Sequence, residues 1–143
     1  MERNMGKGIL AGLIATVVMT MIMYMAPMMG MPKMDVAGML SGMMSLPWIV
    51  GMAIHFMNGV IIFPLIYVFV LYKVLPGNGL VKGITWGLIL FVIAQVMVMP
   101  MAGMGFFSSA SQQQILMVMG SLMGHVVYGA ILGAIVGREA CNC

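Results

Sequence analysis

The two histidines of this chain are the residues best suited to chemistry, and each stands in the same short pattern. His55 is followed four residues later by Gly59, and His125 is followed by Gly129. A neutral imidazole nitrogen is a common ligand for metal ions and for haem iron. A glycine about one helical turn away leaves space beside the ring, because it has no Cβ. His55 and His125 are therefore a candidate pair for a cofactor or metal site.

The matching histidine patterns belong to a longer internal repeat. Residues 7–9 read Lys-Gly-Ile, as do residues 82–84, and the Pro-Met-x-Gly-Met of residues 27–31 returns at 100–104. We interpret the chain as a single transmembrane domain, 1–143, made by duplication of a helical hairpin. The expected boundaries are about 7–73 for repeat 1, about 82–137 for repeat 2 and 138–143 for a tail that ends in Cys-Asn-Cys.

The composition predicts that these repeats lie in a membrane. Charged residues make up 6% of the chain and hydrophobic residues 63%, whereas a soluble domain has about 25% charged residues. Too few charges are present to cover a surface that faces water, so membrane lipids are the expected surroundings. The net charge of +3 rests on a few basic residues beside the apolar stretches, and no nucleic-acid partner is expected.

Four apolar stretches are long enough to cross about 30 Å of hydrocarbon as helices. Because lipid cannot satisfy open backbone groups, we predict an all-α, integral membrane four-helix bundle. Between the first two stretches, Asp35 is the expected N-cap of a short interfacial helix over Val36–Met44. The expected spans are about Gly8–Pro27, Pro47–Tyr72, Val81–Met101 and Gln114–Gly137.

Basic residues predict how the bundle is oriented. Only Lys33 falls on the side of the methionine-rich loops, and the other basic residues fall on the opposite side. The positive-inside rule then places both termini in the cytoplasm and the loops outside. The expected location is the bacterial inner (cytoplasmic) membrane, with multiple passes. The residues on the cytoplasmic side are Arg3, Lys7, Lys73, Lys82 and Arg138.

The repeat also predicts the depth of the two histidines. Each copy holds two spans, so the copies run parallel and are related by a pseudo-two-fold axis along the membrane normal. His55 and His125 should then lie at similar depth in the outer half of the bilayer. Small and polar residues recur every fourth position around each of them, and such stripes mark helix contacts in lipid. The second and fourth helices can face each other across the centre.

One functional alternative is a b-type haem with two axial imidazoles. His55 and His125 would ligate the iron, while Gly59 and Gly129 would make room for the macrocycle. The two His-x-x-x-Gly segments resemble membrane cytochrome b bundles, whose haem histidines lie on the second and fourth helices. Each helix here has a single histidine, so the resemblance implies one haem at most.

A second alternative is a Cu(I) site, because methionine accounts for 22 of the 143 residues. Thioether sulfur and imidazole nitrogen are ligands that suit Cu(I). The candidate ligands are His55, His125, Met28, Met31, Met101 and Met104. Against this, methionine is spread through all four spans and is also a flexible packing residue. The histidines, for their part, would need no ligand if they bonded backbone carbonyls or polar neighbours such as Asn58, Gln95 and Ser121.

No enzyme is predicted. Asp35 is the single aspartate, and Glu2 and Glu139 lie at the two ends of the chain. No paired carboxylates, no nucleophile with a base and no phosphate-binding loop can be assembled from these positions.

The chain resembles a family of small bacterial four-span proteins that is known only as a domain of unknown function. The resemblance rests on residues 27–35, 51–59, 98–105 and 124–129 and covers nearly the whole chain. It implies the four-helix fold and no activity. Short loops and glycine-lined faces favour an accessory subunit that packs against other membrane protein subunits, as in a respiratory or electron-transfer complex. The haem or Cu(I) carrier is the competing hypothesis.

Overall fold

The structure is a computed structural model, and it describes residues 5–137. The predicted tail 138–143, with both cysteines, lies outside the described residues, as do Arg3 and Arg138. Four helical spans form a bundle, which confirms the predicted all-α membrane fold. Each span begins and ends within a few residues of its predicted bounds. They are Met5–Met29, Trp48–Val74, Gly79–Met101 and Gln114–Gly137.

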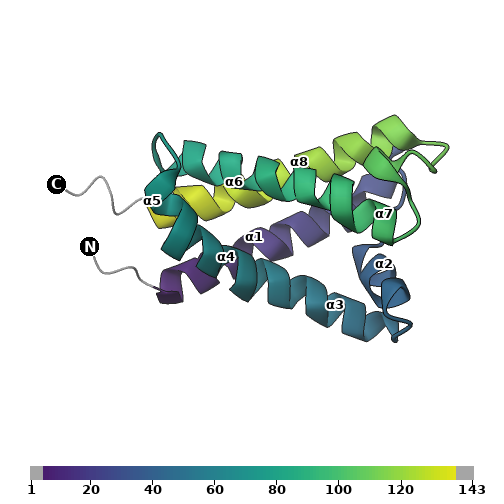
Figure 1. Ribbon diagram of the computed structural model, residues 1–143, viewed down its shortest axis with the longest axis horizontal. Coiled ribbons are helices and arrows are strands. Elements are labelled where there is room, and N and C mark those ends of the chain that lie inside the picture. Colours follow the sequence, from purple (N-terminus) through teal and green to yellow (C-terminus); the bar gives the residue numbers. More distant parts are fainter. Residues whose placement is uncertain (1–4, 138–143) are drawn as a thin grey trace.

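In the bundle of Figure 1, the first span is an α-helix that ends in a 3-10 turn at Ala26–Met29 and the fourth is one α-helix, whereas π-helical turns interrupt the second and third spans. α1 (Met5–Met25) and α8 (Gln114–Gly137) run without interruption. In the other two spans, π-helical turns separate shorter α-helical pieces. The second span is α3 (Trp48–Met57), a π turn at Asn58–Ile62, α4 (Phe63–Ile66), a π turn at Tyr67–Leu71 and α5 (Tyr72–Val74). The third is α6 (Gly79–Ile93), a π turn at Ala94–Val98 and α7 (Met99–Met101).

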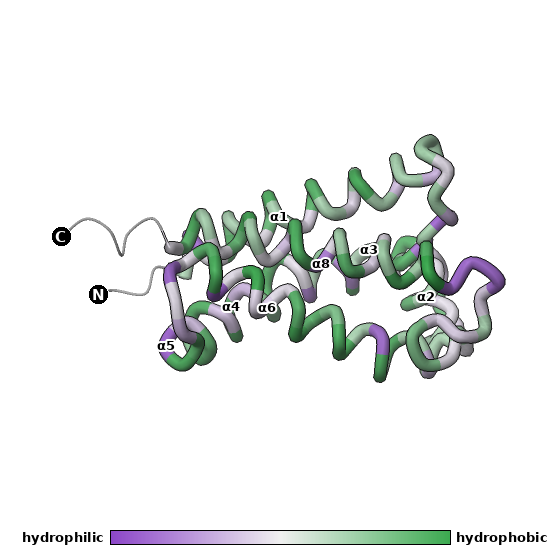
Figure 2. The backbone as a smooth tube through the Cα atoms, turned by 90° about the horizontal axis from the view of Figure 1, so that it is seen from above, coloured by the Kyte–Doolittle hydropathy of each residue, from purple (hydrophilic) through white to green (hydrophobic). Residues whose placement is uncertain are grey.

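Figure 2 shows hydrophobic residues along most of the spans and hydrophilic stretches mainly at the connections. We call the end with the connections 30–47 and 102–113 the loop end of the bundle. The opposite end, which holds the tight connection 75–78 between the second and third spans, is the turn end. This distribution fits helices that cross an apolar layer and leave it at both ends.

Glycine backbones hold the second hairpin together. A Cβ built at Gly129 would meet the carbonyl oxygen of Gly83 and lie 2.9 Å from the amide nitrogen of Gly87. Gly133 and Gly79 meet in the same way one turn further along. In lipid, such contacts let helices gain van der Waals energy over a long seam. The small-residue stripes therefore mark helix contacts, as the sequence predicts.

The first hairpin makes the equivalent contact at positions that the repeat pairs with it. A Cβ built at Gly12 would lie 2.7 Å from the carbonyl oxygen of Gly59 and 3.0 Å from that of Val60. One turn further along α1, Thr16 lies against Gly59. At these positions the first hairpin is as tight as the second, but its close contact covers a shorter length.

The two hairpins meet most fully along α1 and α8 and less fully between the second and third spans. The Tyr67 hydroxyl donates to the Gly79 carbonyl oxygen at 3.1 Å near the turn end. Farther along, the rings of Phe63 and Trp86 meet edge to face at 6.2 Å. Toward the loop end, α3 and α7 lie apart (Figure 1). The bundle is therefore less tightly packed on this side.

A short helix, α2 (Val36–Met43), follows the first span and packs on α3. Asp35 caps it as predicted, because its Oδ1 accepts a hydrogen bond of 2.8 Å from the backbone N–H of Gly38. The indole N–H of Trp48 donates to the same oxygen at 3.0 Å. Gly51 allows the close approach, since a Cβ there would meet the Ala37 carbonyl. α2 thus lies across the loop end, where the Asp35 carboxylate connects its first turn to Trp48 of α3.

Replacing Gly129 by alanine should destabilise the bundle. The new methyl group would meet the Gly83 backbone, which can move only if α6 and α8 separate, and overpacking of this kind costs about 1–3 kcal/mol. The control is Gly42→Ala in α2, where a Cβ meets nothing within 4 Å. Helix propensity makes that change neutral or favourable by about 1 kcal/mol. Unfolding free energies in mixed micelles measure both, and equal losses would contradict the glycine seam.

The cap of α2 should weaken in acid. The hydrogen bond from the Gly38 amide, with smaller contributions from Trp48 and Lys33, holds the pKa of Asp35 below its ordinary value. The cap therefore stabilises α2 above the unfolded-state pKa of about 3.9. The stabilisation is lost as the pH falls through the lower pKa of the folded state.

The amide chemical shift of Gly38 reports this titration, with a midpoint expected below pH ~3.9. Asp35→Asn keeps a capping side chain but has no proton to gain, so its Gly38 shift should not change with pH. If the Gly38 amide shift of Asp35→Asn still changes with pH below ~3.9, a group other than Asp35 causes the change.

Candidate functional site

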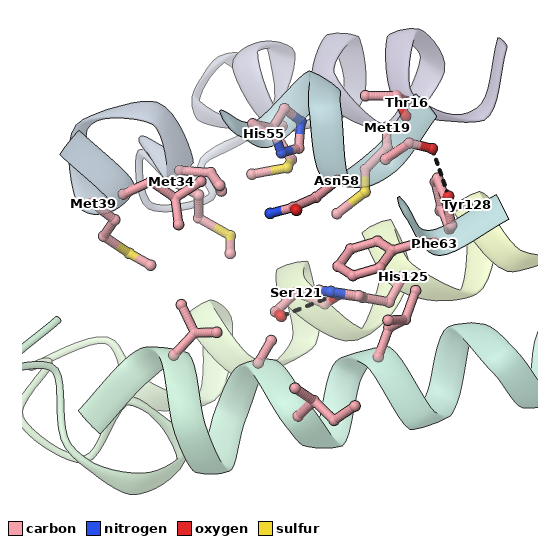
Figure 3. Close-up of a pocket in the computed structure, with 18 of the residues that line it drawn as sticks. Thr16, Met19, Met34, Met39, His55, Asn58, Phe63, Ser121, His125 and Tyr128 are labelled. Carbon is pink, nitrogen blue, oxygen red and sulfur yellow. Dashed lines mark hydrogen bonds between the residues drawn. The ribbon is translucent and has the colours of Figure 1, made fainter. Parts of the chain in front are cut away.

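Both histidines line one cavity of about 140 Å³ between the two hairpins (Figure 3). His55 and Asn58 lie on the wall formed by the second span, and Ser121 and His125 lie on the facing wall, formed by α8. α2 contributes Met39 and other apolar side chains at the loop end. The arrangement brings together the two residues that the repeat pairs. It also places them across the centre of the bundle, on the second and fourth spans.

The hydrogen bonds of His55 define which ring nitrogen carries its proton. Its Nε2 lies 3.0 Å from the Thr20 hydroxyl oxygen. Thr20 has a single hydroxyl proton, which it donates to the Thr16 carbonyl oxygen at 2.7 Å. With that proton donated to the Thr16 carbonyl, the Thr20 oxygen accepts from His55 Nε2–H, and this network assigns the tautomer. His55 Nδ1 then carries no proton and has a free lone pair.

His125 is held in the opposite tautomer. Its Nδ1 lies 2.8 Å from the carbonyl oxygen of Ser121, one turn earlier in α8. A carbonyl can only accept, so Nδ1 carries the proton and Nε2 carries the lone pair. The ring also meets Phe91 edge to face at 6.2 Å. Each histidine therefore has one nitrogen bound to the protein and one available as an acceptor.

A buried polar cluster supports the His125 wall. Gln95 is 0% exposed, and its amide N–H donates to the Ser121 hydroxyl at 3.0 Å. The Ser108 hydroxyl approaches the other end of that amide, at 3.5 Å. The repeat pairs Gln95 with Thr20, so the two histidines have polar side chains from equivalent helices behind them. Thr20 contacts its histidine directly, whereas Gln95 acts through Ser121.

Tyr128 joins the two hairpins beside the cavity. In the π turn after α3, the N–H of Phe63 bonds the Asn58 carbonyl. The next residue, Pro64, has no N–H to offer the following carbonyl, that of Gly59. The Tyr128 hydroxyl supplies the missing donor at 2.7 Å. The sequence analysis does not include Tyr128 among the candidate site residues. The signal that could have indicated it is Pro64, because a proline inside an apolar span leaves a carbonyl that needs another donor.

The structure does not place the predicted methionines in this cavity. Met28 and Met101 are 85% and 69% exposed. Met31 and Met104 are half-buried, and neither is among the residues that line it. A different set of thioethers lines the cavity, and the sequence analysis does not predict that these residues lie together. These residues are Met19, Met23, Met34, Met39 and Met99.

The spacing of residues along α1 predicts part of this set of cavity methionines. Met19 and Met23 follow Thr16 and Thr20 at helical spacing, on the face of α1 that the small residues mark as buried. Met34 and Met39 come from the connection and from α2. Their position depends on where that short helix folds, which no spacing within the spans indicates.

The cavity does not fit a haem. Gly129 is closed by Gly83 and Gly87, and Gly59 is closed by Thr16, so neither glycine leaves space for a macrocycle. The volume of about 140 Å³ is close to that of an engineered cavity of about 150 Å³ that binds benzene. A porphyrin is several times larger than benzene. The histidines instead border a space for a small ligand.

The two tautomers are open to direct measurement. Long-range ¹H–¹⁵N spectra of histidine-labelled protein in micelles should show His55 protonated at Nε2 and His125 at Nδ1. Thr20→Val removes the acceptor of His55 and should release its tautomer while the His125 signals stay unchanged. Two histidines with the same tautomer, or a Thr20→Val variant that leaves His55 unaffected, would contradict the hydrogen-bond assignment.

Comparison with known proteins agrees with the fold. No curated protein and no solved structure matches the chain. One family model matches residues 2–141 and carries the description "family of unknown function (DUF6789)". That match confirms the resemblance drawn from the sequence motifs. The chain therefore belongs to the DUF6789 family of unknown function, as a protein with four helices that are long and apolar enough to cross a membrane.

Proposed function

We propose that this chain is a non-catalytic membrane protein that binds a small ligand in the cavity between its two hairpins. The observation that carries the proposal is the paired histidine geometry. His55 and His125 come from different hairpins, line the same cavity, and each has one ring nitrogen bound and one unprotonated. A mostly apolar lining that includes a few polar side chains is usual for a small-ligand site.

The cavity itself favours a ligand. Its volume of about 140 Å³ and its mostly apolar lining suit an occupant no larger than benzene. A larger side chain at Ala94, which lines the cavity, would occupy this volume if packing were the only requirement. The lining instead combines a small residue at this position with two histidines, as a small ligand would require.

Binding is favoured over catalysis by the carboxylate chemistry of the described residues. Within residues 5–137 the one carboxylate is Asp35, and its oxygens accept from Gly38 and Trp48. It lies at the start of α2 and is not among the residues lining the cavity. A paired acid and base for proton transfer is therefore not part of the proposal.

We infer that the chain lies in a bacterial inner membrane with both termini in the cytoplasm. Lys73 and Lys82 lie near the turn end and Lys33 lies at the loop end, and the positive-inside rule supports this orientation. The cavity then opens in the outer half of the bilayer.

The accessory-subunit hypothesis ranks second. The second span is the least enclosed, with 22% of its most apolar stretch buried against 39% for the first. Its exposed apolar face would suit a partner helix, but lipid covers such a face equally well. The paired histidines have no role in that hypothesis.

Native mass spectrometry of the protein released from its own membrane tests both hypotheses. The wild-type chain should carry a small bound species, and Ala94→Phe, which fills the cavity, should lack it. Met97→Phe is the matched control, because Met97 lies on the same helical turn and is 58% exposed. Its bound species should be unchanged.

Two outcomes would contradict ligand binding. One is a wild-type mass equal to the bare chain in every preparation. The other is a bound species that persists in Ala94→Phe. A stable larger assembly with another protein chain, unaffected by Ala94→Phe, would favour the accessory subunit instead.

A further inference from the structure

We propose that the ligand is a soft monovalent metal ion, with Cu(I) as the biological candidate, held by imidazole nitrogen and by the thioethers that line the cavity. The proposal rests on the proposed function and names its ligand class. It differs from the sequence prediction in the sulfur donors. These are the buried methionines of α1 and of the segment before α2, in place of Met28, Met31, Met101 and Met104.

The nitrogen donors are His55 Nδ1 and His125 Nε2. Both are unprotonated, so metal binding displaces no proton from either ring. The other nitrogen of each ring is fixed, by Thr20 in one case and by the Ser121 carbonyl in the other. Metal-bound histidines nearly always have this second hydrogen bond, because it sets the tautomer and orients the ring. Both histidines have such a bond in this structure.

Two of the thioethers that line the cavity with His125 approach α8 at the glycines just before it. A Cβ built at Gly124, the residue before His125, would lie 3.3 Å from Met19 Cε. One turn earlier, a Cβ at Gly120 would lie 2.9 Å from the sulfur of Met34. The two glycines thus leave room on α8 for methionine side chains. Met19 and Met34 lie on the His55 side of the cavity in Figure 3, so their thioethers reach toward α8 across it.

The donor set selects a soft ion. Thioether sulfur binds Cu(I) well, whereas Mg²⁺ and Ca²⁺ prefer carboxylate and carbonyl oxygen. Methionine is flexible, so its sulfur can move to a metal while the backbone stays in place. Four of the five thioethers, those of Met19, Met23, Met34 and Met99, are buried, which protects the metal from water.

Charge selects a monovalent ion. The residues lining the cavity include no aspartate, glutamate or cysteine, so a bound ion would keep its full charge in a medium of low dielectric constant. The cost of burying that charge grows with the square of the charge. Burying a divalent ion such as Zn²⁺ among the same neutral ligands therefore costs far more free energy than burying Cu(I).

Anaerobic Cu(I) titration of the full-length protein in detergent, against a coloured Cu(I) chelator, tests the assignment. The wild type should bind one Cu(I) per chain, and Ag(I), which has the same charge and similar softness, should compete for it. Zn²⁺ should not compete. Met19→Leu and Met34→Leu conserve volume and should each weaken Cu(I) binding more than about ten-fold.

The matched controls are Met28→Leu and Met101→Leu, whose thioethers are exposed at the loop end. They should leave Cu(I) affinity unchanged. X-ray absorption at the copper edge supplies a second measurement that does not depend on affinity. It should detect nitrogen and sulfur ligands, and the sulfur signal should fall in Met19→Leu and Met34→Leu but stay in the controls.

Three results would overturn the proposal. These are loss of binding in the controls but not in the cavity variants, Zn²⁺ binding as tightly as Cu(I), or full Cu(I) binding in Ala94→Phe. An organic molecule found in the wild-type cavity by native mass spectrometry would also remove the metal assignment while the ligand-binding function stands. A bare wild-type chain that also fails to bind Cu(I) would remove both.

Discussion

The close approach of helix backbones within each hairpin is the contact on which the other features depend. Gly83 and Gly129 meet in the second hairpin, and Gly12 and Gly59 meet at paired positions in the first. In lipid there is little hydrophobic drive for helices to associate, so contact area and close packing must hold them. The two hairpins meet along α1 and α8, and the less complete fit lies between the second and third spans toward the loop end. The cavity lies there, with one histidine from each side.

Backbone polar groups impose a second requirement, and they link the two hairpins. Pro64 leaves the Gly59 carbonyl without its backbone donor, and Tyr128 of the other hairpin supplies one. The third span has the same combination of a π turn and a following proline, at Pro100. π turns of this kind are frequent at functional sites, and here they lie on two walls of the cavity. The irregular backbone and the candidate site therefore occupy the same level of the bundle.

Much of the fold could be predicted because its causes are local. The length of the apolar runs predicts the spans, and the Asp35 cap predicts the start of α2. The stripe of small residues correctly predicts that Gly129 faces another helix. The candidate site could be predicted only in part. The repeat pairs His55 with His125, but Met28 and Met101 are exposed, while Met19 and Met34 line the cavity with the histidines. Abundant methionine carries no spacing signal that separates a ligand from a packing residue.

Hydropathy, capping and repetition along the chain predict the four spans, their approximate bounds and the pairing of the two histidines. The surroundings of those histidines depend on how the helices pack. The His55 tautomer depends on Thr20 of another helix, whereas the His125 tautomer depends on the Ser121 carbonyl of its own helix. The position of Met34 depends on where the connection before α2 folds back. The contacts of His55 and Met34 join segments that are distant along the chain. Their geometry is set by how closely the glycine faces let the helices approach, and a linear pattern does not contain that distance.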